Sequence, residues 1–278
     1  MRVTRRPVVA MLGAVVVLAG CSSDSKPPSA ASAAESTASA SSPAARTLQI
    51  LVSNDDGVAA PGIDALVQAL AAEPDTLVTV VAPAANQSGT GATTSPGPLT
   101  ATKTTTASGY PATSVEGYPA DAVSYGLSAV LASPPDLVIS GANAGQNLGP
   151  VLDISGTIGA ARVATQQGIP ALAVSAGFGN PIDFASAVSA AISWLHDHRD
   201  AVVAPHEPPT SVANLNVPSC DAGAVRGQVM VAADPAAPTD VAVSPADCTS
   251  TAPPGATDVP TFHAGFATLS DVPLRAAS

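Results

Sequence analysis

The sequence predicts a doubly wound α/β domain, in which helices cover both faces of a parallel sheet, with further strands appended towards the C-terminus. Between residues 48 and 196, short apolar runs alternate with segments of helical periodicity. Strands that are buried on both faces read as uninterrupted apolar runs, because neither face meets water. Polar clusters follow three of these runs, where open α/β sheets bind their ligands.

The first expected strand covers residues 48–53, an apolar and partly β-branched run that the turn sequence Asn54-Asp55-Asp56-Gly57 ends. A helix is expected next, because apolar residues recur at helical spacing between 63 and 70 after Pro61-Gly62. The alternation continues in chain order: strand 77–82, helix 120–131, strand 136–140, helix 157–167, strand 169–175 and helix 184–196.

The pattern changes after residue 198 to Pro-rich loops around short β-like pieces. These pieces lie at 211–217, at 224–231 and in a final stretch from 261 to 274. We therefore expect one domain over residues 47–278, with its core at 47–200 and appended strands within 211–275.

The N-terminal segment is typical of a secretory signal. Residues 1–20 combine a basic start with an apolar run, and Leu18-Ala19-Gly20-Cys21 looks like a bacterial lipobox, so that cleavage would leave Cys21 as a lipid-modified N-terminus. The apolar run, about 13 residues, is short for a membrane span. Residues 22–46 are mostly Ser, Ala, Pro and Thr, which predicts a disordered linker. We expect an extracytoplasmic protein that only a lipid anchors to the bacterial cell membrane.

The charge balance argues against a polymeric nucleic acid as partner. Ten basic side chains face 21 acidic ones, for a net charge of −11, whereas a protein that tracks phosphates needs a basic face. A small anionic substrate remains compatible with this charge if a metal ion supplies positive charge locally.

Cys220 and Cys248 remain after Cys21 is assigned to lipidation. In an oxidising compartment they form a disulfide or stay as two inert thiols, and the sequence leaves both open. A metal site built on them is not expected, because no further Cys and no close His pair accompanies them. His196 and His198 are two residues apart on an expected helix and point in different directions, which favours surface positions.

Three polar clusters come directly after expected strands: Asp55-Asp56, residues 87–91 with Ser88, and residues 140–145 with Asn143. Two adjacent carboxylates repel each other and lose hydration, and a divalent cation relieves both effects. Asp, Ser and Asn oxygens suit hard ions such as Mg²⁺, Mn²⁺ or Ca²⁺. Taken alone, Asp-Asp-Gly would also fit a plain turn with Asx hydrogen bonds.

A fourth cluster, Ser155-Gly156-Thr157, precedes an expected helix and suits either an anion cradle or ordinary N-capping. A Gly-Lys-Ser/Thr sequence is absent, which excludes a P-loop. A Gly-x-Ser-x-Gly elbow is also absent, so nucleophilic serine catalysis is not favoured.

Four ordered motifs resemble those of the SurE family of metal-dependent nucleotidases and acid phosphatases. They are Ser53-Asn54-Asp55-Asp56-Gly57 with Ala60-Pro61-Gly62, Ala82-Pro83 with Gln87-Ser88-Gly89, Ser140-Gly141-Ala142-Asn143-Ala144-Gly145-Gln146-Asn147, and Ser155-Gly156-Thr157-Ile158-Gly159-Ala160-Ala161. The resemblance spans residues 48–196, with weaker echoes in Asn214-Leu215-Asn216-Val217-Pro218 and residues 265–274.

This resemblance implies a Rossmann-like three-layer α/β/α fold and hydrolysis of nucleoside monophosphates by metal-activated water. It implies Asp55, Asp56, Ser88 and Asn143 as ligands of Mg²⁺ or Mn²⁺, with Asp55 or Asp56 also handling the proton of the water. The phosphate pocket would consist of Asn54, Gly57, Asn147, Ser155, Gly156 and Thr157. The C-terminal strands would serve contacts in a homodimer or homotetramer.

The sequence departs from the family around the pocket rather than at the ligands. Relatives often carry charged residues where this chain has Ala84 and Ala85, His at Ala92, acidic residues at Pro150 and Val151, and Tyr at Ile154. These departures motivate a second hypothesis, a non-catalytic surface lipoprotein that binds metal and phosphate without turnover. A third hypothesis is an interaction protein in which the fold persists as a scaffold.

Overall fold

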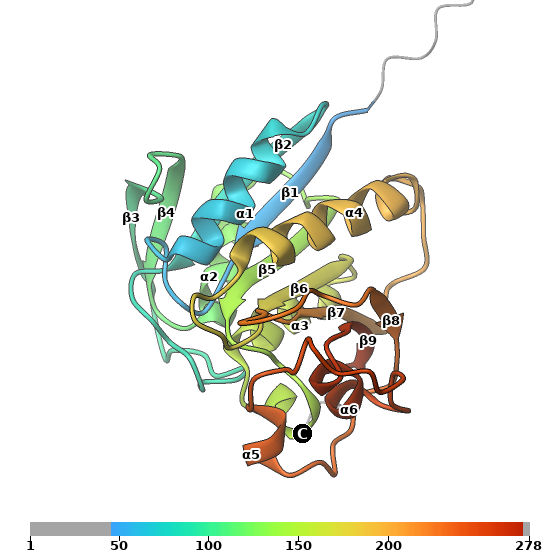
Figure 1. The fold of residues 1–278 in the computed structure, drawn as a ribbon. Coiled ribbons are helices and arrows are strands. Elements are labelled where there is room, and N and C mark those ends of the chain that lie inside the picture. The colour runs from blue at the N-terminus through green and yellow to red at the C-terminus, as the bar shows by residue number, and fades with distance from the viewer. Residues whose placement is uncertain (1–45, 275–278) are drawn as a thin grey trace, which may run out of the picture. The chain divides into compact units, whose positions relative to one another are not determined.

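A nine-stranded sheet runs through residues 46–274, the part of the chain that the computed structural model describes (Figure 1). Its strands are β1 (Leu48–Ser53), β2 (Thr76–Pro83), β3 (Thr100–Thr105), β4 (Pro111–Glu116), β5 (Leu137–Ala144), β6 (Ala171–Ala176), β7 (Ser211–Val217), β8 (Gln228–Met230) and β9 (Ala267–Pro273). The helices are α1 (Pro61–Ala72), α2 (Pro119–Tyr125), α3 (Gly156–Gln166), α4 (Phe184–Val203), α5 (Thr239–Ala242) and α6 (Asp258–His263). A π-helical turn, η1 (Gly126–Val130), continues α2, and a 3₁₀ turn, η2 (Gly149–Asp153), precedes α3.

The strand order is β3-β4-β2-β1-β5-β6-β7-β9-β8. All pairs between β4 and β7 are parallel, whereas β3 and β9 run antiparallel to their neighbours β4 and β7. The chain leaves β1 towards β2 on one side and later adds β5 on the other side. The order therefore reverses between β1 and β5, and open α/β sheets bind ligands at such a switch point, beyond the carboxyl ends of the strands.

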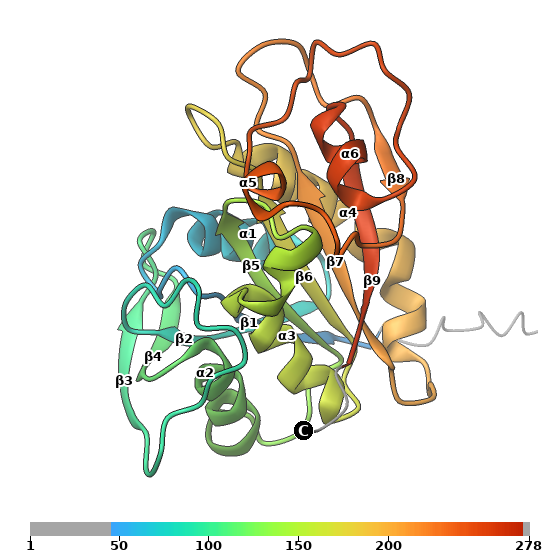
Figure 2. The same cartoon turned by 90° about the horizontal axis from the view of Figure 1, so that it is seen from below.

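Two hydrophobic cores lie on opposite faces of the sheet. Helices α1 and α4 pack on one face and α2 and α3 on the other (Figures 1 and 2). The alternation of a strand divides β1 between them, because Ile50 and Val52 join the first core and Leu51 joins the second. Each fully buried Leu or Ile of this kind contributes about 1.5–3 kcal/mol. The doubly wound three-layer fold is therefore confirmed.

Several boundaries differ from the sequence prediction, although β1 and β7 match it. The strand expected at 136–140 extends to Ala144, because a bulge between Ser140 and Asn143 lets pairing with β6 resume. The strand expected at 224–231 is reduced to the three residues of β8. The stretch from 261 to 274 divides into α6 and β9. Helix α4 continues beyond 196 to Val203.

The β3–β4 hairpin was not predicted, and it makes one edge of the sheet antiparallel. Strand β3 is Thr-Ala-Thr-Lys-Thr-Thr and is largely exposed, so it lacks the apolar run that indicates a buried strand. Asp64 of α1 fastens the hairpin, since its carboxylate accepts hydrogen bonds from Thr106 and Ser108 of the connecting turn.

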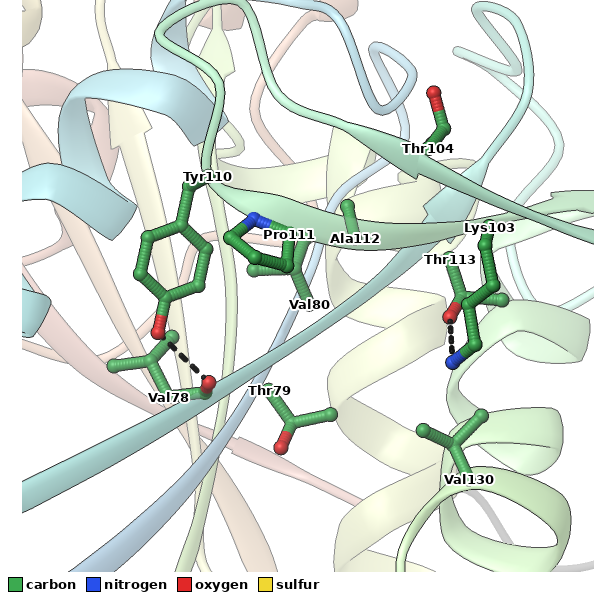
Figure 3. A pocket seen from close by; sticks show the side chains of 10 residues that line it. All are labelled: Val78, Thr79, Val80, Lys103, Thr104, Tyr110, Pro111, Ala112, Thr113 and Val130. Carbon is green, nitrogen blue, oxygen red and sulfur yellow. Dashed lines mark hydrogen bonds between the residues drawn. The ribbon is translucent and has the colours of Figure 1, made fainter.

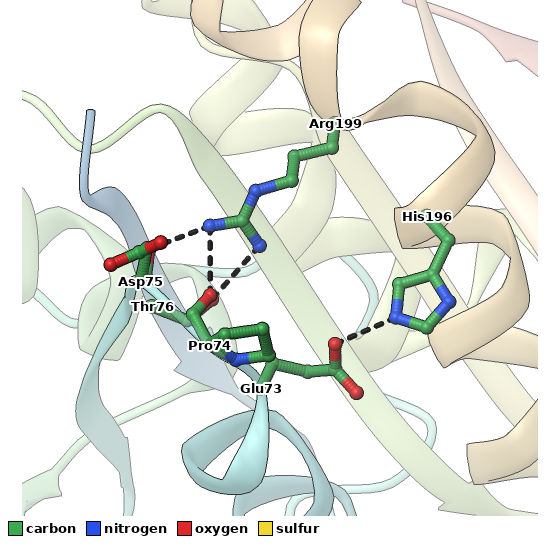
Figure 4. Close-up of polar contacts among 6 residues, drawn as sticks. All are labelled: Glu73, Pro74, Asp75, Thr76, His196 and Arg199. Atoms are coloured by element: carbon green, nitrogen blue, oxygen red, sulfur yellow. Dashed lines mark hydrogen bonds and ion pairs between the residues drawn. The ribbon is translucent and has the colours of Figure 1, made fainter. Parts of the chain in front are cut away.

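Helix α4 is tied to the connection between α1 and β2 (Figure 4). His196 contacts the Glu73 carboxylate at 2.6 Å, and the Arg199 guanidinium donates to the backbone oxygens of Pro74 and Asp75. His198 stacks on the Trp194 ring at 4.2 Å instead. His196 therefore contacts the connection after α1, whereas His198 packs on its own helix.

The structure pairs Cys220 with Cys248 in a disulfide, with 5.7 Å between the Cα atoms. Within residues 46–274, none of the helices is long and apolar enough to span a membrane. The predicted signal segment, Cys21 and nearly all of the predicted linker lie outside the described residues.

Candidate active site

The loop after β1 forms a rigid turn that carries two neighbouring carboxylates. Asn54 closes this turn, because its side chain both donates to the Gly57 carbonyl and accepts from the Gly57 N–H. Gly57 adopts φ +103°, and a Cβ there would lie 3.1 Å from the Ala85 backbone. A glycine is therefore needed at this position, and Asp55 and Asp56 are held at the switch point of the sheet.

Asp55 is almost fully buried and faces the first turn of α3. The Thr157 hydroxyl donates a 2.7 Å hydrogen bond to its Oδ1. A Cβ on Gly156 would lie 2.7 Å from the Asp55 Cβ and 2.9 Å from its Oδ2, so the helix approaches this closely only with glycine there. Burial raises the pKa of Asp55 to about 6; the bond from Thr157 opposes that rise, and the charge of Asp56 adds to it.

Asp56 joins the loop after β2 to the end of β5. Its Oδ2 accepts from the Ala144 N–H at 3.0 Å, and its Oδ1 accepts from the Asn86 side chain at 3.4 Å. Burial raises the pKa of Asp56 as well. Two carboxylates that both resist ionisation, next to each other and with no basic side chain among their partners in the described region, create a need for positive charge.

The predicted neutral ligands lie on these same two segments. The Gln87 N–H donates to the Asp55 carbonyl, and the Ser88 N–H donates to the Asn86 side chain, which docks the loop that carries Ser88. Within residues 46–274, the Ser88 hydroxyl makes no hydrogen bond. Asn143 lies inside β5 beyond the bulge, not after the strand as expected, and its Nδ2 donates to the Gly145 carbonyl. Its Oδ1 is left as an acceptor or ligand.

A buried chain of hydrogen bonds supports Asp55 through Thr157. The Asn147 Nδ2 donates to the Ser175 hydroxyl at 2.9 Å and to the Thr157 hydroxyl at 3.3 Å. The Asn147 backbone is itself clamped, because Asn216 accepts from its N–H, and both Asn216 and Asn214 donate to its carbonyl. The Asn-x-Asn pattern on β7 signals this clamp in the sequence, but it does not show that Asn147 is the residue these side chains bond.

The residues predicted to bind phosphate divide into two groups. Asn54 and Asn147 are buried, and their side-chain amides are used within the protein. The Ser155 hydroxyl caps α3 by accepting from the Ile158 N–H at 3.1 Å, which fits the capping interpretation. The first N–H groups of a helix have no intrahelical partner, and Gly156 and Thr157 begin α3 beside Asp55, whose carboxyl receives a hydrogen bond from the Thr157 N–H.

The donor set suits a hard divalent cation. Asp55, Asp56, Ser88 and Asn143 can each present oxygen ligands. No group of three or more His, Cys, Asp or Glu side chains converges within residues 46–274. A cation held here would therefore have two charged and two neutral protein ligands.

A cavity of about 380 Å³ opens beside Asp56. It is lined by Asp56, Gly57, Ala59, Ala60, Pro61, Ala84, Asn86, Ala144 and Phe184. A larger cavity of about 510 Å³ lies between β2 and the β3–β4 hairpin, where Lys103 and Tyr110 face it (Figure 3). Of the predicted site residues, Asp56 and Gly57 line the smaller cavity, and none lines the larger one.

The predicted rim residues lie on the loop after β2 and on the segment that precedes α3. Ala84 lines the cavity, and the Ala85 backbone packs on Gly57. Pro150 and Val151 belong to η2, and Ile154 is 54% exposed. The Ile154 carbonyl accepts from the Gly91 N–H, which brings the loop after β2, with the neighbouring residue Ala92, over the start of α3.

Comparisons with known proteins agree with this architecture. The family model described as "Survival protein SurE" matches residues 50–238. The chain is 41% identical over 187 residues to the 5'-nucleotidase SurE of Geobacter metallireducens, covering 66% of this chain and 69% of that protein. It is 43% identical over 176 residues to the 5'-nucleotidase SurE of Prochlorococcus marinus, covering 62% and 64%.

A solved structure gives the same result for the fold. The crystal structure of the SurE protein from Aquifex aeolicus superposes with a TM-score of 0.66 at 26% identity. The match covers 83% of this chain and 95% of that one. The similarity therefore extends past the core into the C-terminal strands.

Proposed function

The chain belongs to the SurE family, and on this premise we propose that it is a divalent-metal-dependent phosphomonoesterase that hydrolyses nucleoside monophosphates. One observation carries the proposal: Asp55 and Asp56 meet the start of α3 and the end of β5 at the switch point of the sheet. Carboxylates for a cation and a helix N-terminus for an anion are thus adjacent.

The side chains divide the work of phosphoester hydrolysis. Mg²⁺ or Mn²⁺ bound by Asp55, Asp56, Ser88 and Asn143 would offset phosphoryl charge and lower the pKa of water. The N–H groups at the start of α3, which carry the partial positive charge of the helix dipole, donate to the phosphoryl oxygens. A carboxylate oxygen of Asp55 or Asp56 accepts the proton of the attacking water. Thr157 orients Asp55 for both tasks.

The proposal is tested on the soluble fragment that starts at residue 45. Phosphate release is measured from a panel of nucleoside monophosphates with Mn²⁺, with Mg²⁺ and with chelator, and cation binding is measured by calorimetry. We expect cation-dependent release in the wild type, and loss of both release and cation binding in Asp55→Asn. The exposed Asp197→Asn variant is the matched control and should retain both. A folded wild-type protein that releases no phosphate would refute the proposal.

A second candidate function is metal-dependent binding without turnover. The small apolar rim favours it, because Ala84 and Ala85 supply no charged group to the substrate. Calorimetry separates the two candidates, since binding of a nucleoside monophosphate with cation but without release of phosphate would favour the second one.

We also propose that the protein is lipid-anchored outside the cytoplasm. The Leu18-Ala19-Gly20-Cys21 sequence supports this location, and a disulfide between Cys220 and Cys248 is typical of oxidising compartments. Incorporation of labelled palmitate into the full chain, and its loss in Cys21→Ala, would test it.

For assembly we propose a homodimer or homotetramer that uses the C-terminal strands. Light scattering on the soluble fragment would measure its mass, and a monomer at all concentrations would contradict the proposal.

A further inference from the structure

The cavity beside Asp56 is lined by residues at or after the ends of four different strands. Gly57 and residues 59–61 come after β1, Ala84 and Asn86 after β2, Ala144 ends β5, and Phe184 begins α4 after β6. The cavity therefore opens at the same edge of the sheet as the proposed phosphate site, and it shares Asp56 and Gly57 with that site. A molecule bound through its phosphoryl group at the start of α3 has this cavity within reach.

The chemistry of the walls restricts what the cavity takes. Asp56 is the single ionisable side chain that lines it, and the remaining lining is mostly Ala, Pro, Gly and Phe. The Asn86 amide is used internally, because it donates to Asp56 and accepts from the Ser88 N–H. No basic side chain lines the cavity that could pair with a second anionic group of a ligand. The cavity therefore suits a neutral and partly apolar group.

Phe184 supplies a flat ring in a fixed position. Asp183 caps α4 by accepting from the Ser186 N–H at 3.0 Å, which sets Phe184 as the first residue of the helix. Its ring packs on Gly62, where a Cβ would lie 2.7 Å from the ring atom Cε1. Aromatic residues make up only 3% of the chain, and this one lines a cavity that contains a proposed ligand carboxylate.

We propose that this cavity is the subsite for the nucleoside half of the substrate, with Phe184 as a specificity-determining residue that contacts the base or ribose. The inference rests on the proposed function, and it adds the place and the chemistry of leaving-group recognition. A nucleoside offers the neutral, partly apolar surface that the walls match, and every base has a face on which an aromatic ring can pack. A short aliphatic ester such as glycerol phosphate has no base that could pack on Phe184.

The test compares two substrates in three phenylalanine variants. For Phe184→Leu we expect kcat/KM for AMP to fall by about 10-fold, mainly through KM, because one aromatic contact is lost. Hydrolysis of glycerol phosphate should stay unchanged. Phe184→Tyr keeps the ring and should retain most of the preference for AMP. Phe266→Leu, a half-buried phenylalanine in the C-terminal segment, is the matched control and should behave as wild type.

Adenosine binding by equilibrium dialysis gives a readout that needs no turnover, and thermal unfolding confirms that each variant is folded. Equal losses for AMP and glycerol phosphate in folded Phe184→Leu, or unchanged adenosine affinity, would overturn the subsite. If the wild type hydrolyses neither ester, the proposed function fails, yet adenosine binding that depends on Phe184 would still support the subsite. Absence of adenosine binding in that case would overturn both.

Discussion

Replacement of Thr157 by Val tests the link between helix α3 and the buried carboxylate. Val has nearly the same shape as Thr but cannot donate the 2.7 Å hydrogen bond to the Asp55 Oδ1. It also removes one of the two acceptors of the Asn147 amide, the other being Ser175. Because Thr157 is fully buried, water does not replace the missing hydroxyl.

The expected effect follows from the kind of bond that is lost. A hydrogen bond to a charged group contributes about 1.5–3 kcal/mol, which corresponds to roughly 10- to 150-fold in an equilibrium. The bond also lowers the pKa of Asp55 against the effect of burial, so its removal raises that pKa above about 6. A proton then competes more strongly with the cation. We expect kcat/KM to fall by roughly 10- to 100-fold at neutral pH and the required cation concentration to rise.

The assay is phosphate release from AMP over a range of Mn²⁺ concentrations, alongside urea unfolding. Thr157→Ser retains the hydroxyl and should remain within a few-fold of wild type, which separates the hydrogen bond from the packing of the methyl group. If Thr157→Val and Thr157→Ser have the same kcat/KM and the same cation dependence, the bond does not orient Asp55 and the reasoning is wrong.

Three further predictions concern stability and close packing. Cys220→Ser removes a crosslink to Cys248 that closes a 28-residue separation, and we expect about 3–4 kcal/mol lower unfolding free energy in urea, with no difference from wild type in reductant. Although burial acts to raise the pKa of Asp64, its several hydrogen bonds together hold that pKa below the ordinary 3.8. The ionised group therefore stabilises the fold above that pH and loses this effect as pH falls through the folded pKa. Asp64→Asn should unfold more easily than wild type at pH 7, and the difference should shrink in acid. Gly156→Ala places a methyl group 2.7 Å from the Asp55 Cβ, so phosphate release should drop at least about 10-fold, while near-wild-type release would contradict the close approach.

The sequence predicted those elements whose signal is local. Strand β1 is an apolar run with a turn at its end, and its bounds match the structure. The β3–β4 hairpin was not predicted because β3 is exposed and rich in Thr and so has no apolar run. Its strand conformation depends on its pairing with β4. The bulge before Asn143 was not predicted for a related reason, because pairing with β6 determines where β5 ends.

The site shows the same division between local and long-range information. The rule that strand ends meet at one edge of a parallel sheet was enough to place Asp55, Asp56 and Asn143 close together. The partners of these residues depend on packing between distant segments. The cavity wall at Phe184, for example, exists because α4 begins where it packs against Gly62 of α1.

The C-terminal strands belong to the site and are more than an addition to its edge. Asn214 and Asn216 of β7 hold both backbone groups of Asn147, whose side chain reaches Thr157 and thereby Asp55. Strand β9 covers the outer edge of β7 along its length, so the clamp is buried inside the sheet rather than at a frayed margin. A carboxylate near the start of the domain is thus oriented by residues about 160 positions later in the chain. The position of Asp55 therefore depends on a buried network that extends to β7, whose outer edge β9 covers.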